Sequence, residues 1–342
     1  MRTHASTGAA GMTTRRTLLL GLGALAVAGM GYSVGAFREA RVQSAGRLAG
    51  RSTVIPTRAG ALEYAIAGDG PPLLMIHGTG GGFDQGLLFA AQLQQRGFRI
   101  IAPSRFGYLG SELPRDASPA HQADTFVELL DHLCVDRLAV VGGSAGALSA
   151  AEFTLRHPDR CSHLALLVPA ADLANRDPVQ FTAMQQRAVD AVLGSDAAFW
   201  SLSRLAPGFM LRTLLATDPA LLDRVSLRER RRAQAILDQI FPIGRKVDGL
   251  RADAYWAGAP TSTAHERITV PTLIVSCEDD LFGTAATARL LARRIPGADL
   301  TIFPTGGHIW LGHDDEVATR IAAFVRGGAA VRDACGRRWG TR

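Results

Sequence analysis

The sequence has few of the residue types that mark specialised classes of protein. Only four of its 342 residues are cysteine, which is too few for a framework stapled by disulfides. Aromatic residues make up 6% of the chain, and Lys246 is its only lysine. With 47% hydrophobic and 20% charged residues, the composition also excludes a disordered or collagen-like chain. The length is sufficient for one large domain or two ordinary ones with a substantial buried core.

The formal net charge of +6 is not spread along the chain. Residues 1–51 contain seven Arg and one Glu, and residues 328–342 contain four Arg and one Asp, so residues 52–327 carry a net charge of −3. Because the basic charge lies at the two ends, the central part lacks the polycationic surface that nucleic acids require. We therefore expect no nucleic-acid partner, and we expect residues 328–342 to form a flexible basic tail.

Long apolar runs are also scarce, and only residues 17–37 form one. These 21 uncharged residues follow Arg15-Arg16 and, as a helix, would reach across the roughly 30 Å hydrocarbon core of a bilayer. Two interpretations compete: a retained membrane anchor, or an export signal that resembles a twin-arginine signal and has a small-residue cleavage site at Ala26-Val27-Ala28. A buried soluble helix is the remaining alternative. We predict a membrane-anchored or exported protein in which residues 1–51 are anchor or signal and linker.

The rest of the chain alternates short apolar runs with stretches of helical spacing. A hairpin is predicted at residues 54–67, and buried strands are predicted at residues 73–76, 99–102, 138–141, 164–168, 273–276 and 300–303. Helices are predicted between them, at residues 87–96, 120–133, 147–156, 284–294 and 316–325. This alternation indicates an α/β fold with a mostly parallel, doubly wound sheet.

Strand signals vanish between residues 170 and 265, where only helical stretches such as 199–215 and 223–240 remain. We expect a core of residues 52–169 and 266–327, and a helical insertion of residues 170–265 over the edge of the sheet. Some apolar residues of this insertion have two open interpretations, as an acyl pocket or as buried core: Phe199, Trp200, Phe209, Met210, Leu211 and Leu214.

The strongest chemical motif is Gly142-Gly143-Ser144-Ala145-Gly146, placed between a predicted strand and a predicted helix. A nucleophilic serine needs a sharp turn that exposes its hydroxyl, and small residues on both sides relieve the crowding in that turn. The following helix would direct its N-terminal amides towards a developing anion. The alternative is an ordinary N-cap serine in a glycine-rich turn.

A second glycine-rich loop, His77-Gly78-Thr79-Gly80-Gly81-Gly82, follows the predicted strand 73–76. Backbone amides of this loop could hold an oxyanion together with the amide of Ala145. A phosphate-binding loop is excluded because Phe83 stands where the glycine pattern requires a further Gly. We interpret His77 as a structural hydrogen-bonding residue rather than a base.

A base and an acid are expected from the last two predicted strands. One strand runs into Cys277-Glu278-Asp279-Asp280, and the other is followed by Gly307-His308. Because both loops lie at the same sheet edge as Ser144, His308 could take the serine proton while Asp280 orients the imidazole. His313 is interpreted as capping the last helix or solvated.

These motifs, in the order Ser, Asp, His, resemble the α/β-hydrolase superfamily over residues from about 53 to 327. The resemblance implies that Ser144 is the nucleophile, His308 the base and Asp280 the acid, with Asp279 and then Asp172 as alternatives. It assigns the oxyanion amides to Thr79 and Ala145, and residues 170–265 to a cap. The loop from Pro103 to Ser111 departs from the family's usual one, although Arg105, Gly107 and Ser111 keep part of its pattern, so no substrate contacts carry over.

We predict a serine hydrolase that cleaves small or medium carboxylic esters through an acyl-serine. It needs neither a metal nor an organic cofactor, because no His/Cys cluster has ligand spacing. The alternative reaction is hydrolysis of carbon–carbon bonds in diketone-like substrates by the same triad. Two further alternatives are a catalytically silent binding protein with this fold and a membrane-tethered interaction protein that acts through its Arg-rich ends.

Overall fold

The computed structural model describes residues 33–171, 183–258 and 263–327. The chain divides into two compact units, residues 1–47 and 48–342, and in the first unit residues 33–47 are helical. Most of the apolar segment 17–37 lies outside the described residues. Among the described helices, none combines the length and the apolar character that crossing a bilayer demands. Membrane attachment or export therefore stays a prediction from the sequence.

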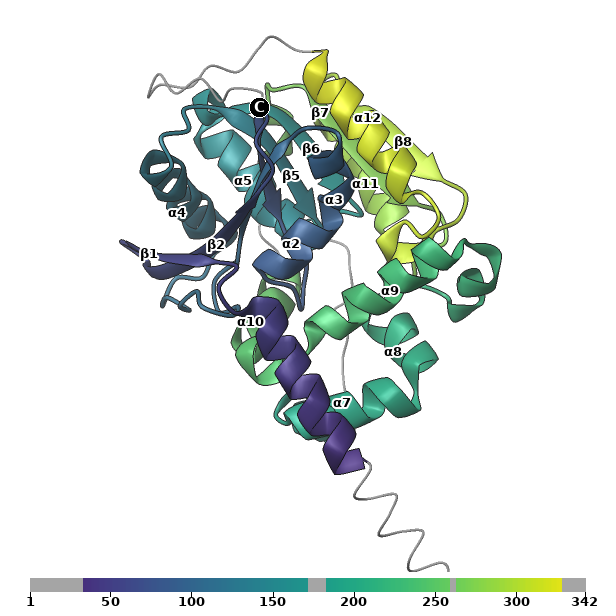
Figure 1. Cartoon of the computed structure of the whole chain (residues 1–342). Helices are drawn as coiled ribbons and strands as arrows, with labels where there is room; N and C mark the ends of the chain where they lie inside the picture. Colours follow the sequence, from purple (N-terminus) through teal and green to yellow (C-terminus); the bar gives the residue numbers. More distant parts are fainter. Residues whose placement is uncertain (1–32, 172–182, 259–262, 328–342) are drawn as a thin grey trace, which may run out of the picture. The chain divides into compact units, whose positions relative to one another are not determined.

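The second unit is built on an eight-stranded sheet in which the predicted strands are all present (Figure 1). Its strands are β1 (Thr53–Thr57), β2 (Gly60–Ala67), β3 (Pro72–Ile76), β4 (Arg99–Pro103), β5 (Leu138–Gly143), β6 (Cys161–Leu167), β7 (Thr272–Cys277) and β8 (Asp299–Phe303). They pair in the order β1-β2-β4-β3-β5-β6-β7-β8. The β1–β2 hairpin and the β2–β4 pair are antiparallel, and the other neighbours are parallel. The predicted α/β fold is confirmed.

The order of the strands determines where a site can form. Strand β3 pairs with β4 on one side and with β5 on the other, so the chain changes direction along the sheet at this point. In doubly wound sheets, ligands bind beyond the carboxyl ends of the strands at such a switch point. The two glycine-rich loops begin here, because β3 ends before His77 and β5 ends before Ser144.

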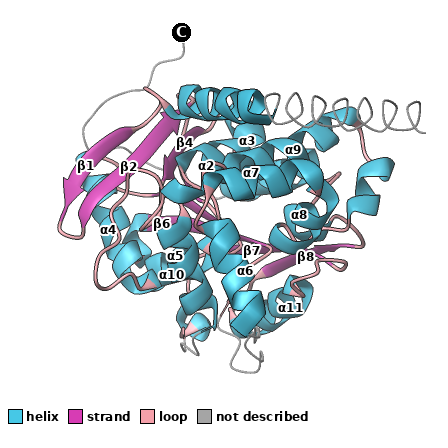
Figure 2. Cartoon of the chain, turned by 90° about the horizontal axis from the view of Figure 1, so that it is seen from below, coloured by secondary structure: helices cyan, strands magenta, loops and turns pink. Residues whose placement is uncertain are grey.

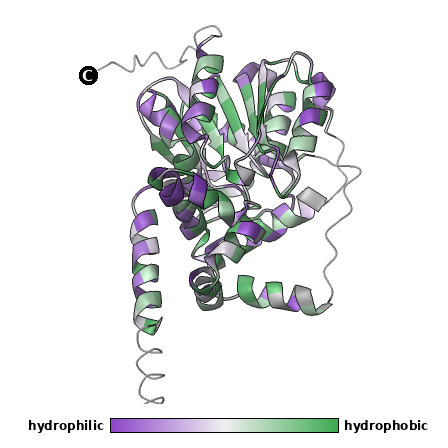
Figure 3. Ribbon diagram, turned by 90° about the vertical axis from the view of Figure 1, so that its right-hand side faces the viewer, coloured by the Kyte–Doolittle hydropathy of each residue, from purple (hydrophilic) through white to green (hydrophobic). Residues whose placement is uncertain are grey.

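Alternating side chains of the strands bury both faces of the sheet. Leu74 and Ile76 belong to one hydrophobic cluster, whereas Leu73 and Met75 belong to the other. This is the two-residue period of a strand covered on both faces, and Figure 3 shows the strands coloured as hydrophobic over much of their length. The covering helices of the core are α2 (Phe83–Phe89), α3 (Ala91–Gln95), α4 (Pro119–His132), α5 (Gly146–Arg156), α11 (Thr284–Arg294) and α12 (Asp314–Arg326).

One predicted core helix is wrong in its limits. We predicted a single helix over residues 87–96, but helix α2 begins at Phe83 and is separated from α3 by Ala90. The backbone angles of Ala90, φ −95° and ψ 6°, lie outside the helical range. Alanine is the best helix former, so nothing in the local sequence marks this interruption.

Between β6 and β7 the described residues form helices and no strand, and Figure 2 shows several of these helices in front of the sheet. We call this set the cap helices: α6 (Ala183–Leu193), α7 (Asp196–Leu205), α8 (Pro207–Leu214), α9 (Leu227–Ile240) and α10 (Val247–Gly258). The predicted helical stretch 199–215 is divided because Pro207 lacks an amide hydrogen and starts a new helix as its first residue.

Candidate active site

Ser144 stands on a strained turn between β5 and α5. Its φ of +51° lies in the left-handed region, which non-glycine residues seldom adopt. The neighbouring glycines make the turn possible: a Cβ on Gly142 would lie 2.6 Å from the Cβ of Ala150, and one on Gly146 would lie 2.5 Å from the carbonyl oxygen of Ile76. The turn therefore presents the Ser144 hydroxyl at the carboxyl edge of the sheet.

Three side chains from distant parts of the chain meet at this turn. The His308 Nε2 atom lies 2.8 Å from Ser144 Oγ, and the His308 Nδ1 atom lies 2.8 Å from Asp280 Oδ2. Asp280 is 5% exposed and His308 is 7% exposed, so both side chains are largely shielded from water. With Asp280 accepting from Nδ1–H, Nε2 is left to accept a proton from the serine hydroxyl.

The environment of Asp280 keeps its carboxyl ionised. Burial alone would raise its pKa, but the hydrogen bond and the charge of His308 act in the opposite direction and lower the pKa below its usual range. The Thr284 hydroxyl and the Phe282 amide also donate to this carboxylate and lower its pKa further. A buried carboxylate with these partners can hold the imidazole in one tautomer.

The adjacent acid, Asp279, has a different set of partners. Its two carboxylate oxygens accept from the amides of Gly306 and Gly307, at 3.2 and 2.8 Å. Asp279 thus braces the loop that carries His308, whereas Asp280 contacts the imidazole itself. The third candidate acid, Asp172, lies outside the described residues.

The two amides expected to hold an oxyanion border the same pocket as Ser144. Thr79 follows β3, and Ala145 directly follows the serine. Within the described part of the chain, neither amide donates a hydrogen bond to another group. The flanking amides do have partners: Gly78 N–H donates to Gln85 Oε1 at 3.2 Å, and Gly80 N–H donates to Tyr108 Oη at 3.2 Å.

The other two histidines considered in the sequence have different surroundings. His77 is fully buried, with its Nε2 accepting from the Arg105 amide at 2.9 Å and its Nδ1 2.7 Å from the Gly78 carbonyl oxygen. The structural role predicted for His77 is confirmed. His313 is the N-cap residue of α12, although its side chain makes no capping hydrogen bond. Its partly exposed ring stacks on Phe303, with 4.0 Å between the ring centroids.

A pocket of about 390 Å³ opens over Ser144 and His308 between the sheet edge and the cap helices. Most of its lining is apolar and includes Phe89, Val168, Leu214, Leu250, Phe282 and Trp310. Of the six cap residues proposed as an acyl pocket or buried core, only Leu214 lines it, whereas Phe199, Met210 and Leu211 are buried and Phe209 is exposed. Among the residues that the structure describes, no three His, Cys, Asp or Glu side chains gather as a metal site would need.

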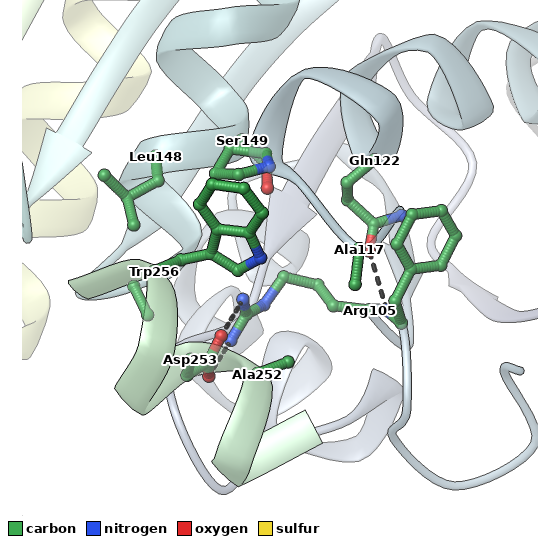
Figure 4. A pocket seen from close by; sticks show the side chains of 11 residues that line it. Arg105, Ala117, Gln122, Leu148, Ser149, Ala252, Asp253 and Trp256 are labelled. Atoms are coloured by element: carbon green, nitrogen blue, oxygen red, sulfur yellow. Dashed lines mark hydrogen bonds and ion pairs between the residues drawn. The ribbon is translucent and has the colours of Figure 1, made fainter. Parts of the chain in front are cut away.

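Sequence analysis missed a buried polar network beside this pocket. Arg105, in the loop after β4, donates through both terminal nitrogens to Asp253 of α10, at 2.6 Å each. The Tyr108 hydroxyl donates to the same carboxylate at 2.6 Å. Figure 4 shows the guanidinium of Arg105 and the carboxylate of Asp253 facing each other near Trp256, beside a small cavity of about 20 Å³. Asp253 is nearly 150 residues from its partners in the chain, and no motif surrounds it.

Comparison with known proteins agrees with this fold. A family model for the alpha/beta hydrolase fold matches residues 71–312, so the chain belongs to the α/β-hydrolase superfamily. It is similar to the 2-hydroxymuconate semialdehyde hydrolase of Pseudomonas sp. (strain CF600), with 30% identity over 276 residues that cover 78% of this chain and 90% of that protein. It is also similar to the pimeloyl-[acyl-carrier protein] methyl ester esterase of Chromobacterium violaceum, with 28% identity over 264 residues, 75% of this chain and 95% of that protein.

Solved structures give the same result. An alpha/beta hydrolase fold protein from Nakamurella multipartita matches with a TM-score of 0.68 and 27% identity, and covers 81% of this chain and 100% of that one. The esterase EaEST from Exiguobacterium antarcticum shares the fold with a TM-score of 0.60 at 20% identity, over 80% of this chain and 99% of that one. The protein is therefore a hydrolase of the α/β-hydrolase superfamily.

Proposed function

We propose that the protein is a serine hydrolase of small or medium carboxylic esters that works through an acyl-serine intermediate. The observation that supports this proposal most directly is the chain of two 2.8 Å contacts from Ser144 through His308 to Asp280. A serine hydroxyl is a weak nucleophile at neutral pH, and a neutral imidazole within hydrogen-bond distance removes its proton as the bond to carbon forms.

In this reaction Ser144 Oγ attacks the ester carbonyl and transfers its proton to His308 Nε2. Negative charge develops on the carbonyl oxygen, where the unpaired amides of Thr79 and Ala145 would donate to it. His308 then gives the proton to the leaving alkoxide, and the acyl group remains on Ser144. A water molecule activated by His308 attacks this acyl group and restores the free serine.

The pocket supports an acyl group of modest size. Its volume of about 390 Å³ is near the lower end of the range for small-molecule sites, and its lining is mostly apolar. Longer acyl chains bury more apolar surface until the pocket is filled, at roughly 0.8 kcal/mol for each CH₂ group. We therefore expect kcat/KM to rise with acyl length and then to fall once the chain outgrows the pocket.

A fluorophosphonate probe tests the proposed chemistry. The wild type should be labelled at Ser144, and Ser144→Ala should fold but remain unlabelled. The p-nitrophenyl esters of acids of increasing length should then be hydrolysed by the wild type alone. A folded wild type that neither reacts with the probe nor cleaves any of these esters would overturn the proposal and favour a catalytically silent binding protein.

A second candidate reaction is hydrolysis of a carbon–carbon bond in a diketone-like substrate. It is favoured by the similarity to 2-hydroxymuconate semialdehyde hydrolases from two Pseudomonas sources, at 30% and 28% identity. The same side chains could serve both reactions, so the probe does not separate them. Comparing kcat/KM for an aryl ester with that for a vinylogous diketone does, because a value higher for the diketone by tenfold or more would replace the ester proposal.

A further inference from the structure

In the part of the chain that the structure describes, three buried ion pairs link the region of the cap helices with the core. Arg105 pairs with Asp253 at 2.6 Å, Lys246 lies 3.6 Å from Asp84, and Arg232 lies 3.0 Å from Asp314. Every one of these side chains is at most 9% exposed. Burying two charges gains little net stability, so the value of such pairs lies more often in fixing one arrangement of the chain.

The pair formed by Asp253 is connected to the active site by further hydrogen bonds. Asp253 accepts from Arg105 and also from the hydroxyl of Tyr108, at 2.6 Å. The oxygen of that hydroxyl accepts in turn from the amide of Gly80, at 3.2 Å. A continuous path of hydrogen bonds therefore runs from cap helix α10 to the residue that follows Thr79.

We propose that Tyr108 and Asp253 are positioning residues for the oxyanion hole: Asp253 orients the Tyr108 hydroxyl, which holds the Gly80 amide and thereby fixes the Thr79 amide opposite Ser144. This inference rests on the proposed function, because it assumes that the Thr79 amide stabilises the tetrahedral intermediate. It adds a part of the cap to the machinery: Asp253 lines the same pocket as Ser144, and the role proposed for it acts through Tyr108.

The local sequence explains why this loop needs to be held. The loop contains four glycines, Gly78 and Gly80–Gly82, and Gly80 has a φ of +77° that few other residues adopt readily. Without anchors, such a segment has many backbone conformations, whereas an oxyanion donor must lie about 2.7–3.1 Å from the position of the oxygen. The Gly78 amide belongs to the peptide group before the one that carries the Thr79 amide, and the Gly80 amide belongs to the peptide group after it. Their hydrogen bonds to Gln85 and Tyr108 therefore anchor the loop on both sides of the Thr79 amide.

The surroundings of Tyr108 fix its ring and direct its hydroxyl to Asp253 and the Gly80 amide. The side chain is completely buried, its ring packs edge-on against His77 at 4.8 Å between centroids, and the Arg105 guanidinium lies 5.2 Å from the ring. Burial and the charge of Asp253 raise the pKa of Tyr108 well above its usual value, so the hydroxyl keeps its proton. With that proton directed to Asp253, a lone pair of the oxygen is left for the Gly80 amide.

The link to the cap has a mechanistic consequence. Arg105 and Tyr108 belong to the core, but the carboxylate that aligns them comes from α10. The oxyanion hole is therefore complete only when this cap helix is docked. Docking of the cap would then control the chemical step as well as access to the pocket.

Tyr108→Phe tests the inference, because it removes one hydroxyl and leaves the ring and the Arg105–Asp253 pair in place. Losing an oxyanion donor outright costs a factor of about 100 to 1,000 in rate, so a donor that is only loosened should cost about tenfold. We expect kcat for the best ester to fall about tenfold and KM to change less than about twofold, as for an interaction made mainly in the transition state.

A tetrahedral adduct separates positioning from a general structural effect. A trifluoromethyl ketone forms such an adduct on the serine, and its inhibition constant should rise by the same factor by which kcat/KM falls. The pH profile of kcat/KM should keep its shape. Unchanged inhibition by the ketone together with reduced kcat would overturn the inference, and so would wild-type kinetics in Tyr108→Phe.

A second variant and a control complete the design. Asp253→Asn removes the charge that orients the tyrosine and should show the same parallel loss of kcat/KM and adduct affinity, which keeps the test decisive if Tyr108→Phe does not fold. Arg212→Gln disrupts an exposed ion pair with Asp218 on the cap and should leave both quantities unchanged. If Ser144→Ala abolishes probe labelling while Tyr108→Phe behaves as wild type, the proposed function stands and only this inference fails.

Discussion

Asp279 and Asp280 are neighbours in the chain, yet their carboxylates act on different parts of the same loop. Asp280 Oδ2 lies 2.8 Å from His308 Nδ1, whereas Asp279 accepts from the backbone amides of Gly306 and Gly307. One acid contacts the imidazole, and the other braces the turn that leads to it. Substitution of each by asparagine should therefore give different results.

Asp280→Asn should lower kcat by a factor on the order of 10,000, because an amide can donate to the imidazole and stabilise the wrong tautomer. Asp279→Asn retains one acceptor for the loop amides and should lower kcat by less than about tenfold, with a loss of unfolding free energy of about 1 kcal/mol. Ester kinetics and urea unfolding of both variants measure these effects. Equal losses of kcat would show that Asp279 shares the role assigned to Asp280.

The glycines of the Ser144 turn should differ in their tolerance of a methyl group. A Cβ on Gly142 would lie 2.6 Å from the Cβ of Ala150, but a Cβ on Gly143 would meet nothing closer than 3.7 Å. We expect Gly142→Ala to lower the free energy of unfolding by about 1–3 kcal/mol, as overpacking does. Gly143→Ala, the matched control, should change it by less than about 0.5 kcal/mol in the same urea titration.

His77 should make stability fall with decreasing pH. Burial, together with the charge of Arg105, lowers the pKa of His77 well below its ordinary value of 6.5. The unfolded chain therefore takes up a proton as the pH drops through about 6.5, while the folded protein does not. Stability is retained above that pH and decreases below it by up to about 1.4 kcal/mol for each pH unit.

His77→Gln removes this titration and can still accept from the Arg105 amide. Urea unfolding of the wild type and the variant at about pH 7.5 and about pH 5.5 should show the wild type losing about 1 kcal/mol more over this interval. The same pH dependence in both proteins would mean that His77 takes up a proton in the folded protein as readily as in the unfolded chain, contrary to its buried environment.

Lys246 offers a direct measure of cap docking. It is the only lysine of the chain and is completely buried, donating to the carbonyl oxygen of Gln239 and lying 3.6 Å from Asp84. An amine-acylating reagent should leave Lys246 unmodified in the folded protein and modify it fully in urea, as read by mass spectrometry of its peptide. Asp84→Asn should raise the rate of modification. Rapid modification of the native wild type would contradict the buried pair.

The positions of strands and of the central motifs were predictable because their causes are local. Apolar runs such as 138–141 become buried strands wherever they are covered on both faces, and glycine is required where the backbone turns at Ser144. The interruption of the 87–96 helix at Ala90 was not predictable, since no residue there disfavours a helix. Likewise, the stacking of His313 on Phe303 was not predictable, because it depends on how the final helix packs against the sheet.

The order of the motifs along the chain, and the alternation of short apolar runs with helical stretches, determined the sheet and the edge at which Ser144, Asp280 and His308 face one another. Those features follow from steric and hydrophobic preferences that act within a few residues. Only the tertiary structure decided that the adjacent Asp279 accepts from the Gly306 and Gly307 amides, and that a cap carboxylate joins Tyr108 at a separation of 145 residues. A side-chain contact of this kind depends on how two elements pack, and the sequence around either partner does not predict it.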